Sequence, residues 1–380
     1  MRESHPKVLV VTNDFPPTLG GIQTYVRDYL TTLDPQQVVV FASTQDAGAA
    51  AQWDATQSYT VQRWHRGIML PTPAVARRMQ QLIKEHGIHT VWFAAAAPLG
   101  ILAPAARAAG AQRVVASTHG HEVGWSMFPG SRQVLRRIGN SCDAVTFVSR
   151  YARNRLAHAF GPATAWEAMP GGVNVDFFAP TPDSSLVRRR HGLTDSFVIV
   201  AVSRLVPRKG QDTLVEALPE ILERIPNAHL LLVGPGDFAT KLSAMARRRA
   251  VAEKITMTGA VDYDELPAYY GAGDVFALPV RTQWGGLSVE GLGIVYLEAQ
   301  ACGVATIAGS GGGAPETVVD GETGLVVRNR EELVEAIVAL HDNPDMREKI
   351  AAAGVDHVRQ RWTWEVLGRR ARRILAGAVD

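Results

Sequence analysis

Short runs of β-branched and aliphatic residues recur along this 380-residue chain and alternate with stretches of helical periodicity. Two parallel strands need a crossover connection, and a helix usually supplies it. Strands that alternate with helices therefore predict an α/β protein with parallel sheets. The nine runs are KVLVVT, QVVVFAS, HTVWFA, RVVAST, DAVTFVS, FVIVAVS, HLLLVG, KITMTG and DVFALP.

The series of strands pauses between Pro162 and Pro182, where PGGVN and a proline-rich polar stretch intervene. A chain of 380 residues is also too long for one ordinary hydrophobic core. We therefore predict two Rossmann-like domains, residues 1–170 and 171–361. An arginine-rich amphipathic helix is expected in the tail, residues 362–376, and the sequence pattern alone does not decide which domain it packs on. Its apolar residues are Val366, Leu367, Ile374 and Leu375.

Composition favours a globular protein of a reducing compartment, here the cytoplasm. Hydrophobic residues make up 46% and charged residues 20% of the chain, and Cys142 and Cys302 are too few for a disulfide framework. The uncharged stretch from Val91 to Ala106 is interrupted by prolines and is too short to span a membrane, so we predict a strand, a turn and a helix there. Scattered arginines without a recognisable motif argue against nucleic-acid binding.

Gly20 and Gly21 follow the first predicted strand and precede an amphipathic helix. Glycines at this point let the backbone approach a ligand closely and present N–H groups to an anion. By itself the pair is equally typical of a simple turn, since its spacing matches neither GxGxxG nor a P-loop.

A second cationic loop, RLVPRKG, follows the strand FVIVAVS and precedes another helix. Arg204 stands at the strand end and Lys209 just before the helix. Two cations beside a helix N-terminus suit a diphosphate. As isolated residues they would equally suit a solvated loop, and the stretch described next favours the diphosphate.

The stretch GGLSVEGLGIVYLEAQACG carries two acids, Glu290 and Glu298. We expect a short helix from about Ile294 to Cys302, with Gly303 as its left-handed stop. The small residues Gly291 and Gly293 leave the helix N-terminus uncovered, so that its N–H groups and dipole face a developing anion. A lone pair of acids would more simply be surface charges.

Three further segments invite a ligand. In the sequence His119-Gly-His121-Glu122, His119 directly follows a strand and could reach a ligand. The spacing of the three side chains is unlike that of helical zinc motifs, so we predict no metal there. Asp262-Tyr-Asp264 resembles a DxD metal motif, yet it precedes a helical pattern, and a helix-capping acid is the simpler interpretation. Val261 just before it ends a strand region and could offer backbone hydrogen bonds to a base.

Taken together, these stretches resemble the retaining glycosyltransferases of family 4, from the GG loop through SRLVPRKG to the Glu-x7-Glu stretch and GGAPE. The resemblance implies the GT-B architecture, in which two Rossmann-like domains with parallel sheets face each other across a cleft. The N-terminal domain would bind the acceptor and the C-terminal domain the nucleotide sugar. A C-terminal helix, here within residues 362–380, would cross back to the N-terminal domain.

Within that family, three stretches are most similar to enzymes that transfer mannose from GDP-mannose to phosphatidylinositol monomannoside, forming the dimannoside with an α-1,6 linkage. These stretches are NDFPPTLGGIQ, STHGHEVGWSMFPGSRQ and VEGLGIVYLEAQACGV. The resemblance also implies a role for each matching residue. Arg204 and Lys209 would bind the donor diphosphate, and Glu298 the ribose hydroxyls. Glu290 and His119 would contact the sugar, and the backbone contacts would come from Gly20, Gly21, Gly291, Leu292 and Gly293.

These roles imply catalysis without a metal or cofactor, because the cations and the helix N-terminus would stabilise the departing diphosphate. A lipid acceptor implies transient contact with an anionic membrane at its inner face. Candidate surfaces are the segment Pro73–His86, otherwise an ordinary packed helix, and the arginines Arg132, Arg136 and Arg137. The alternatives are a family 4 enzyme that uses a UDP-sugar and a soluble acceptor, a nucleotide-sugar epimerase, and a module that only binds sugar or nucleotide.

Overall fold

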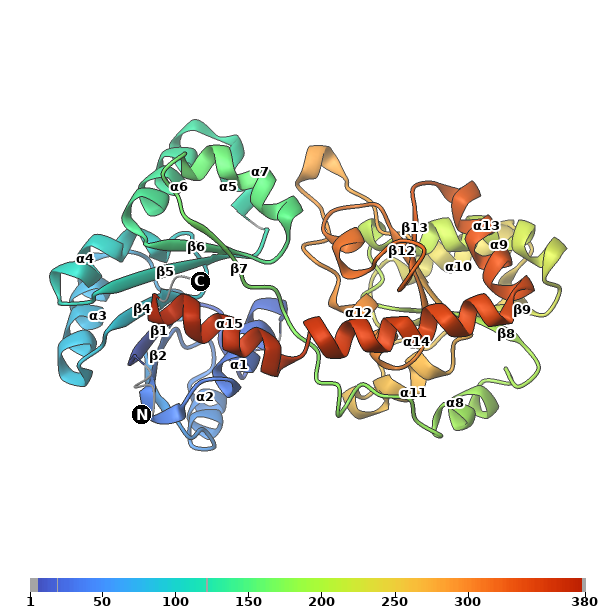
Figure 1. The fold of residues 1–380 in the computed structure, drawn as a ribbon, viewed down its shortest axis with the longest axis horizontal. Helices are drawn as coiled ribbons and strands as arrows, with labels where there is room; N and C mark the ends of the chain where they lie inside the picture. Colours follow the sequence, from blue (N-terminus) through green and yellow to red (C-terminus); the bar gives the residue numbers. More distant parts are fainter. Residues whose placement is uncertain (1–5, 19, 121, 378–380) are drawn as a thin grey trace. The chain divides into compact units, whose positions relative to one another are not determined.

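The computed structural model describes residues 6–18, 20–120 and 122–377. The chain divides into two compact units, each with its own parallel sheet (Figure 1). Unit 1 comprises residues 1–171 and 364–380, and unit 2 comprises residues 172–363. The two ends of unit 2 lie together, because the Val173 amide donates a 2.8 Å hydrogen bond to the Trp362 carbonyl.

Unit 1 contains a seven-stranded sheet in the order β3-β2-β1-β4-β5-β6-β7, and every pairing in it is parallel. Its strands are β1 (Val8–Thr12), β2 (Val38–Ala42), β3 (Thr60–Arg63), β4 (Thr90–Phe93), β5 (Arg113–Thr118), β6 (Ala144–Phe147) and β7 (Trp166–Ala168). Its helices are α1 (Gly21–Thr31), α2 (Ala47–Asp54), α3 (Pro73–His86), α4 (Ala103–Ala108), α5 (Glu122–Met127), α6 (Pro129–Ser141), α7 (Arg150–Phe160) and α15 (Trp364–Ala376).

Side chains of this sheet alternate between two cores, as the period of a strand requires. On β1, Leu9 and Val11 pack in one core with residues of α3, α4, α6 and α7, whereas Val8 and Val10 pack in the other with residues of α1 and α15. Burial on both faces explains why the strands of unit 1 read as continuous apolar runs.

Helix α15 belongs to unit 1 although it lies at the far end of the sequence (Figure 1). Leu367, Ile374 and Leu375 are buried in the core shared with α1, and the Thr90 hydroxyl donates a 2.8 Å hydrogen bond to the Leu375 carbonyl. The predicted amphipathic tail helix and its return to the N-terminal part of the fold are therefore confirmed.

Unit 2 contains a six-stranded parallel sheet in the order β10-β9-β8-β11-β12-β13. Its strands are β8 (Phe197–Val202), β9 (Ala228–Val233), β10 (Ile255–Met257), β11 (Val275–Leu278), β12 (Ala305–Gly309) and β13 (Leu325–Val327). Its helices are α8 (Ser184–Arg190), α9 (Gln211–Arg224), α10 (Ala239–Arg248), α11 (Leu266–Gly271), α12 (Ile294–Ala301), α13 (Arg330–Asp342) and α14 (Pro344–Arg361).

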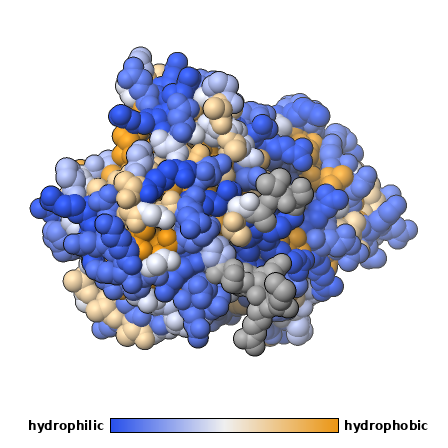
Figure 2. Space-filling view, turned by 60° about the vertical axis from the view of Figure 1, so that its left-hand side comes forward, coloured by the Kyte–Doolittle hydropathy of each residue, from blue (hydrophilic) through white to orange (hydrophobic). Residues whose placement is uncertain are grey.

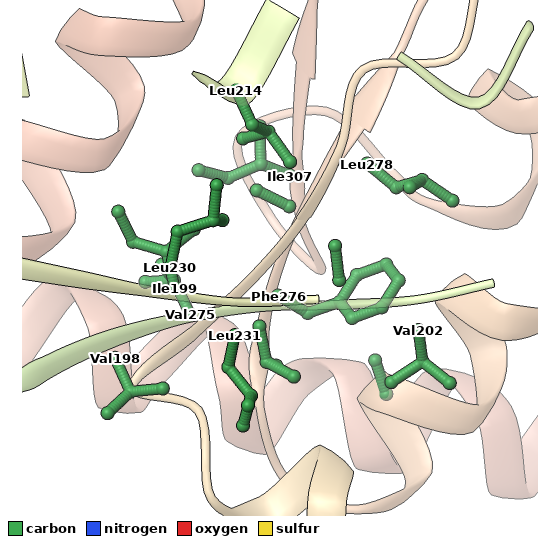
Figure 3. Close-up of a cluster of buried hydrophobic side chains, with 14 of the residues drawn as sticks. Val198, Ile199, Val202, Leu214, Leu230, Leu231, Val275, Phe276, Leu278 and Ile307 are labelled. Carbon is green, nitrogen blue, oxygen red and sulfur yellow. The ribbon is translucent and has the colours of Figure 1, made fainter. Parts of the chain in front are cut away.

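The core of unit 2 is built from aliphatic side chains around a few aromatic rings. Figure 3 shows Phe276 of β11 among residues of the neighbouring strands, including Ile199 and Leu231, with Leu214 of α9 above them. All four are essentially inaccessible to solvent. This buried sheet supports the loops at its carboxyl edge, where the predicted site residues Arg204, Lys209 and Glu290 lie.

All nine predicted strands are present, and the stretch from Val91 to Ala106 forms a strand, a turn and the start of a helix as predicted. Four of the strands in the described residues were missed. Two lie at the edges of the unit 1 sheet, β3 and β7, and two lie at one side of the unit 2 sheet, β12 and β13.

Hydrophilic residues cover most of the face shown in Figure 2, and the hydrophobic residues on it form small groups among them. Among the described residues, the most exposed large hydrophobic ones are Trp284, Phe128 and Ile68, at 75%, 68% and 66%. Within the described ranges, no helix is both long and apolar enough to cross a membrane.

Candidate active site

The loop after β8 carries Lys209 into the interior of unit 2. It forms a short 3-10 helix, Pro207–Lys209, and turns at Gly210 with φ 79° into α9. A side chain at Gly210 would overlap the Pro279 carbonyl oxygen at the end of β11, so only glycine permits this approach. The turn therefore brings Lys209 beside the residues that follow β11.

Lys209 and Glu290 form an ion pair, with 2.6 Å between Nζ and Oε2. Their side chains are only 10% and 12% exposed. Neither charge is well hydrated, so each depends on the other for compensation. The structure thus brings together two of the residues that the sequence predicted to act on the diphosphate and on the sugar.

Glu290 is held in place by the glycine loop that follows β12. The Gly313 amide donates a 3.0 Å hydrogen bond to the Glu290 carbonyl, and a side chain at Gly312 would overlap that same carbonyl oxygen. Close backbone contact of this kind fixes the direction in which the Glu290 side chain leaves the chain.

Helix α12 begins just beyond Glu290, as predicted. Gly293 is its N-cap residue, at φ 92° and ψ 60°, and no side chain caps this end. The helix runs from Ile294 to Ala301, and Gly303 follows at φ 75° as the predicted left-handed stop. Gly291 and Gly293 lie on either side of the buried Leu292 and have no side chains that could cover this end of the helix. The first backbone N–H groups of α12 have no partner within the helix.

Glu298 lies on α12 and accepts a 2.5 Å hydrogen bond from the hydroxyl of Tyr270 on α11. Burial raises the pKa of Glu298 to about 7, against the lowering effects of the Tyr270 hydrogen bond and the nearby charge of Lys209. The electrostatic influence of Lys209 on Glu298 places both acids of the Glu-x7-Glu stretch near a single lysine. Nothing in the sequence had pointed to Tyr270.

Two predicted residues of unit 2 are not joined to this group by any side-chain hydrogen bond or ion pair within the described ranges. Arg204 is exposed, and among the described residues its side chain makes no hydrogen bond or ion pair, while its carbonyl accepts from Gln211 at 3.1 Å. Val261 lies beyond β10 and is half-buried. The assignments of both residues to the donor therefore remain predictions.

In unit 1, His119 follows β5 and is fixed through one ring nitrogen. Its Nε2 lies 2.6 Å from the Ala94 carbonyl oxygen, which can only accept, so Nε2 carries a hydrogen. The imidazole also meets the Tyr25 ring edge to face at 4.8 Å. These contacts determine the tautomer and the orientation of the ring.

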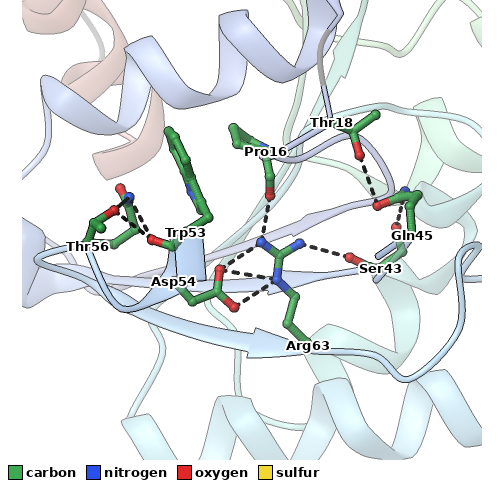
Figure 4. Close-up of polar contacts among 9 residues, drawn as sticks. Pro16, Thr18, Ser43, Gln45, Trp53, Asp54, Thr56 and Arg63 are labelled. Carbon is green, nitrogen blue, oxygen red and sulfur yellow. Dashed lines mark hydrogen bonds and ion pairs between the residues drawn. The ribbon is translucent and has the colours of Figure 1, made fainter. Parts of the chain in front are cut away.

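Gly20 and Gly21 stand where α1 begins, as predicted, and both are exposed. The loop that leads to them is held by Arg63 at the end of β3 (Figure 4). The Arg63 guanidinium donates to the Pro16 carbonyl at 2.6 Å and to the Ser43 carbonyl at 3.0 Å. No sequence pattern had pointed to Arg63, because its strand was not predicted.

Arg63 is itself oriented by Asp54 of α2, which it meets in an ion pair of 2.7 Å (Figure 4). Gln45 supports the same loop, since its amide donates to the Asn13 carbonyl at 3.1 Å. Side chains from the ends of β2 and β3 therefore fix the loop after β1.

Neither suspected metal motif forms a ligand group in the part of the chain that the structure describes, where no cluster of three or more His, Cys, Asp or Glu side chains is arranged to hold a metal. Glu122 accepts from the backbone amides of His119 and Gly120, each at 3.1 Å, and His121 lies outside the described residues. Asp262 occupies the N-cap position of a 3-10 turn, but its side chain makes no capping hydrogen bond, so that part of the prediction is wrong.

The interpretation of Pro73–His86 as a lipid-binding helix is wrong for its apolar face. Val75, Met79, Leu82 and Ile83 are all buried in a core of unit 1. The segment is an ordinary packed helix, the alternative that the sequence had left open.

Two family models match the chain. Residues 19–177 match the model described as Glycosyltransferase Family 4, and residues 183–357 match the model described as Glycosyl transferases group 1. The chain is also 50% identical over 374 residues to the GDP-mannose-dependent monoacylated alpha-(1-6)-phosphatidylinositol monomannoside mannosyltransferase of Corynebacterium glutamicum, covering 97% of both chains. The chain belongs to glycosyltransferase family 4. A second family 4 relative, the GDP-mannose-dependent alpha-(1-6)-phosphatidylinositol monomannoside mannosyltransferase of Mycobacterium tuberculosis, is 50% identical over 379 residues and 98% of both chains.

Solved structures of similar fold support the GT-B architecture of this family 4 chain. HepE of Anabaena in complex with UDP matches with a TM-score of 0.81 at 21% identity, over 98% of this chain and all of the other. Sucrose-phosphate synthase from Thermosynechococcus elongatus matches with a TM-score of 0.75 at 21% identity, over 98% of this chain and 99% of the other. At such identities the likeness concerns the fold alone.

Proposed function

We propose that this family 4 glycosyltransferase moves mannose from GDP-mannose to phosphatidylinositol monomannoside and forms an α-1,6-linked dimannoside with retention of configuration. The 50% identity over nearly the whole chain to enzymes named for that reaction supports the choice of donor and acceptor. The observation that carries the proposal is the nearly buried pair of Lys209 and Glu290, which lies at the start of an uncapped helix.

Cleavage of the bond between mannose C1 and the diphosphate oxygen leaves its electron pair on the leaving group. Lys209, Arg204 and the N-terminus of α12 stabilise this charge as it develops, which is the largest single contribution that a preorganised site makes. Transfer then needs no metal ion. Glu290 accepts hydrogen bonds from mannose hydroxyls and so holds the sugar against the leaving group.

The acceptor hydroxyl attacks C1 from the face that the diphosphate leaves, and its proton passes to the departing phosphate oxygen. No carboxylate is then required as a covalent nucleophile, in contrast to the paired acids of retaining hydrolases. His119 contacts the mannose close to the reacting carbon. Because Nε2 is engaged with the Ala94 carbonyl, the ring meets the sugar in a fixed orientation.

Product analysis tests the proposal. The purified full chain is incubated with GDP-mannose and phosphatidylinositol monomannoside, and the product is identified by mass spectrometry and by the anomeric coupling of the new linkage. We expect an α-linked dimannoside, formed equally well with and without EDTA. UDP-sugars serve as the matched donors. Transfer from a UDP-sugar alone, donor turnover without acceptor, or loss of activity on chelation would each contradict the proposal.

The acceptor is a lipid, so we propose that unit 1 contacts an anionic membrane at its inner face through α6 and α7. These two helices pack together and carry several arginines but no acid. Met127 and Phe128 at the corner before α6 are 46% and 68% exposed. Cationic side chains beside exposed apolar ones are typical of surfaces that bind anionic lipid.

A cavity of about 260 Å³ opens on this surface. Ser126, Met127, Arg132, Asn154, Arg155 and His158 line it. Arg132 is held at the cavity by a 3.0 Å hydrogen bond from Nε to the Ser126 carbonyl. A pocket with this lining suits the phosphate of a lipid headgroup.

Vesicle flotation tests the membrane proposal. The chain should float with vesicles that contain phosphatidylinositol at low salt and less at high salt, because exposed charges are screened. Arg136→Gln with Arg137→Gln should weaken flotation. Arg247→Gln with Arg248→Gln, on α10 of unit 2, is the control that removes the same charge elsewhere. Failure of the wild-type chain to float at low salt would contradict the proposal.

A further inference from the structure

We infer that Tyr270 is a positioning residue for the donor, which orients the Glu298 carboxylate toward the two hydroxyls of the donor ribose. The inference rests on the proposed function only for the presence of a nucleotide ribose. What it adds is a residue outside every motif of the sequence. Its basis is the 2.5 Å hydrogen bond from the Tyr270 hydroxyl to Glu298 Oε2.

Tyr270 can orient another group because it is itself immobile. The residue is completely buried, at 0% exposure. Its ring packs against those of Phe178 and Phe276, with centroids 5.9 and 5.7 Å away. The hydroxyl is therefore a donor at a fixed point, since both torsions of the side chain are set by packing.

Glu298, in contrast, needs an external constraint. A glutamate side chain has several rotatable bonds, and ordering it only when a ligand arrives would weaken binding. The Tyr270 bond occupies one carboxylate oxygen and orders the side chain in advance. Oε1 and the remaining lone pair of Oε2 can then accept from neighbouring hydroxyls.

A vicinal diol is the ligand that matches such an acceptor. Its two hydroxyls can donate to one ionised carboxylate, and in a nucleotide sugar the ribose supplies such a diol. The nearby positive charge of Lys209 favours the ionised form of Glu298, and the Tyr270 hydrogen bond does the same. Against the larger effect of burial, both groups therefore favour the ionised carboxylate, which accepts from two donors.

The test compares the affinities of GDP and 2′,3′-dideoxy-GDP for the full chain by calorimetry. Their ratio reports only the ribose hydroxyls, because base and phosphates are shared. Tyr270→Phe should reduce this ratio about ten-fold through weaker GDP binding, with dideoxy-GDP unaffected. Glu298→Gln should lower the ratio as well.

Tyr296→Phe is the matched control. It removes the hydroxyl of another fully buried tyrosine of unit 2, one that donates at 2.6 Å to the Leu278 carbonyl rather than to an acid. This variant should keep the wild-type ratio whatever it does to thermal stability. If Tyr296→Phe lowered the ratio of GDP to dideoxy-GDP affinity as much as Tyr270→Phe does, the inference would be overturned, because the effect would then be a general one of packing.

The pH dependence gives a second readout that a purely structural role would not move. In the wild type, the GDP to dideoxy-GDP ratio should rise as pH increases through about 7, where Glu298 ionises. Since the Tyr270 hydrogen bond lowers the pKa of Glu298, Tyr270→Phe should move this rise to higher pH.

An unchanged ratio or an unchanged midpoint in Tyr270→Phe would overturn the inference. The same pair of measurements with UDP and 2′,3′-dideoxy-UDP keeps the test separate from the choice of donor. A chain that bound UDP rather than GDP would contradict the proposed function, yet its uridine ratio would still report on Tyr270.

Discussion

Lys209 and Glu290 compensate each other in a place where neither touches much water, yet both are proposed to bind the donor. Donor binding must then exchange part of their mutual attraction for contacts to the diphosphate and to the sugar. Charges held in a poorly hydrated site interact strongly with a new charge, because little solvent has to be reorganised. The pair is thus preorganised for an anionic leaving group.

Lys209→Ala should lower turnover about 100- to 1000-fold, because one contact to the leaving group is lost. It should also reduce the free energy of unfolding by roughly 1–3 kcal/mol, since the Glu290 carboxylate is left without its partner. Steady-state kinetics and urea unfolding measure the two effects.

Lys349→Ala on α14 is the control, because that lysine is exposed. The double variant Lys209→Ala with Glu290→Gln should regain stability but not activity, which separates the two roles. Near-normal turnover of Lys209→Ala would contradict the assignment.

Sequence reasoning identified single residues of the site better than their contacts. Lys209 and Glu290 were recognised from their own motifs, and their pairing depends on the Gly210 turn and on the loop at Gly312, which a linear pattern does not reveal. Tyr270 and Arg63 were missed for a different reason. Each acts by orienting a neighbour, and neither stands in a pattern that distinguishes it from an ordinary residue of a helix or strand.

At the scale of elements, α12 matters through the way it begins. Gly293 has φ 92°, and a side chain there would lie 2.6 Å from Cε2 of the Tyr296 ring. The residue therefore combines a left-handed backbone with a close contact, and both fix the direction of the helix N-terminus beside Glu290.

Gly293→Ala should destabilise the protein by about 1–3 kcal/mol and weaken donor binding, because the start of α12 must shift. Gly321→Ala is the matched control, since φ is 78° there but no atom lies within 4 Å of the added carbon. Thermal unfolding and GDP titration of both variants measure the difference. Equal losses of stability and affinity in the two would show that the contact with Tyr296 has no role.

The strands that the sequence failed to predict are short or atypical. Edge strand β3 has the sequence TVQR and is only partly buried, so it lacks the apolar run that marks a central strand. Strand β7 has three residues, as does β13. Strand β12, ATIAG, is fully buried but built largely from small residues, which give a weak signal.

At the scale of the whole molecule, unit 1 depends on α15 for one of its two cores. Ile374 and Leu375 are 5% and 1% exposed and lie in the cluster with Tyr29 and Leu30 of α1. Unit 2, by contrast, is formed by one uninterrupted stretch of chain.

Ile374→Ala should destabilise unit 1 by roughly 2–5 kcal/mol through loss of buried methyl groups. Hydrogen exchange resolved by peptide should show reduced protection in β1 and α1 and little change in unit 2. Ile350, on α14, is 2% exposed. Ile350→Ala should reduce the protection of amides in unit 2 and leave β1 and α1 of unit 1 little changed. Faster hydrogen exchange in unit 2 of the Ile374→Ala variant would contradict the division into units.

The return of α15 to unit 1 also orders events during synthesis on the ribosome. The strands of unit 1 emerge first, but the face that α15 covers stays open until residues 364–376 have been translated. Unit 2 has all of its residues available earlier. The half of the protein that is made first is therefore the last that can be completed, and its uncovered apolar face is a point at which a nascent chain is exposed to aggregation.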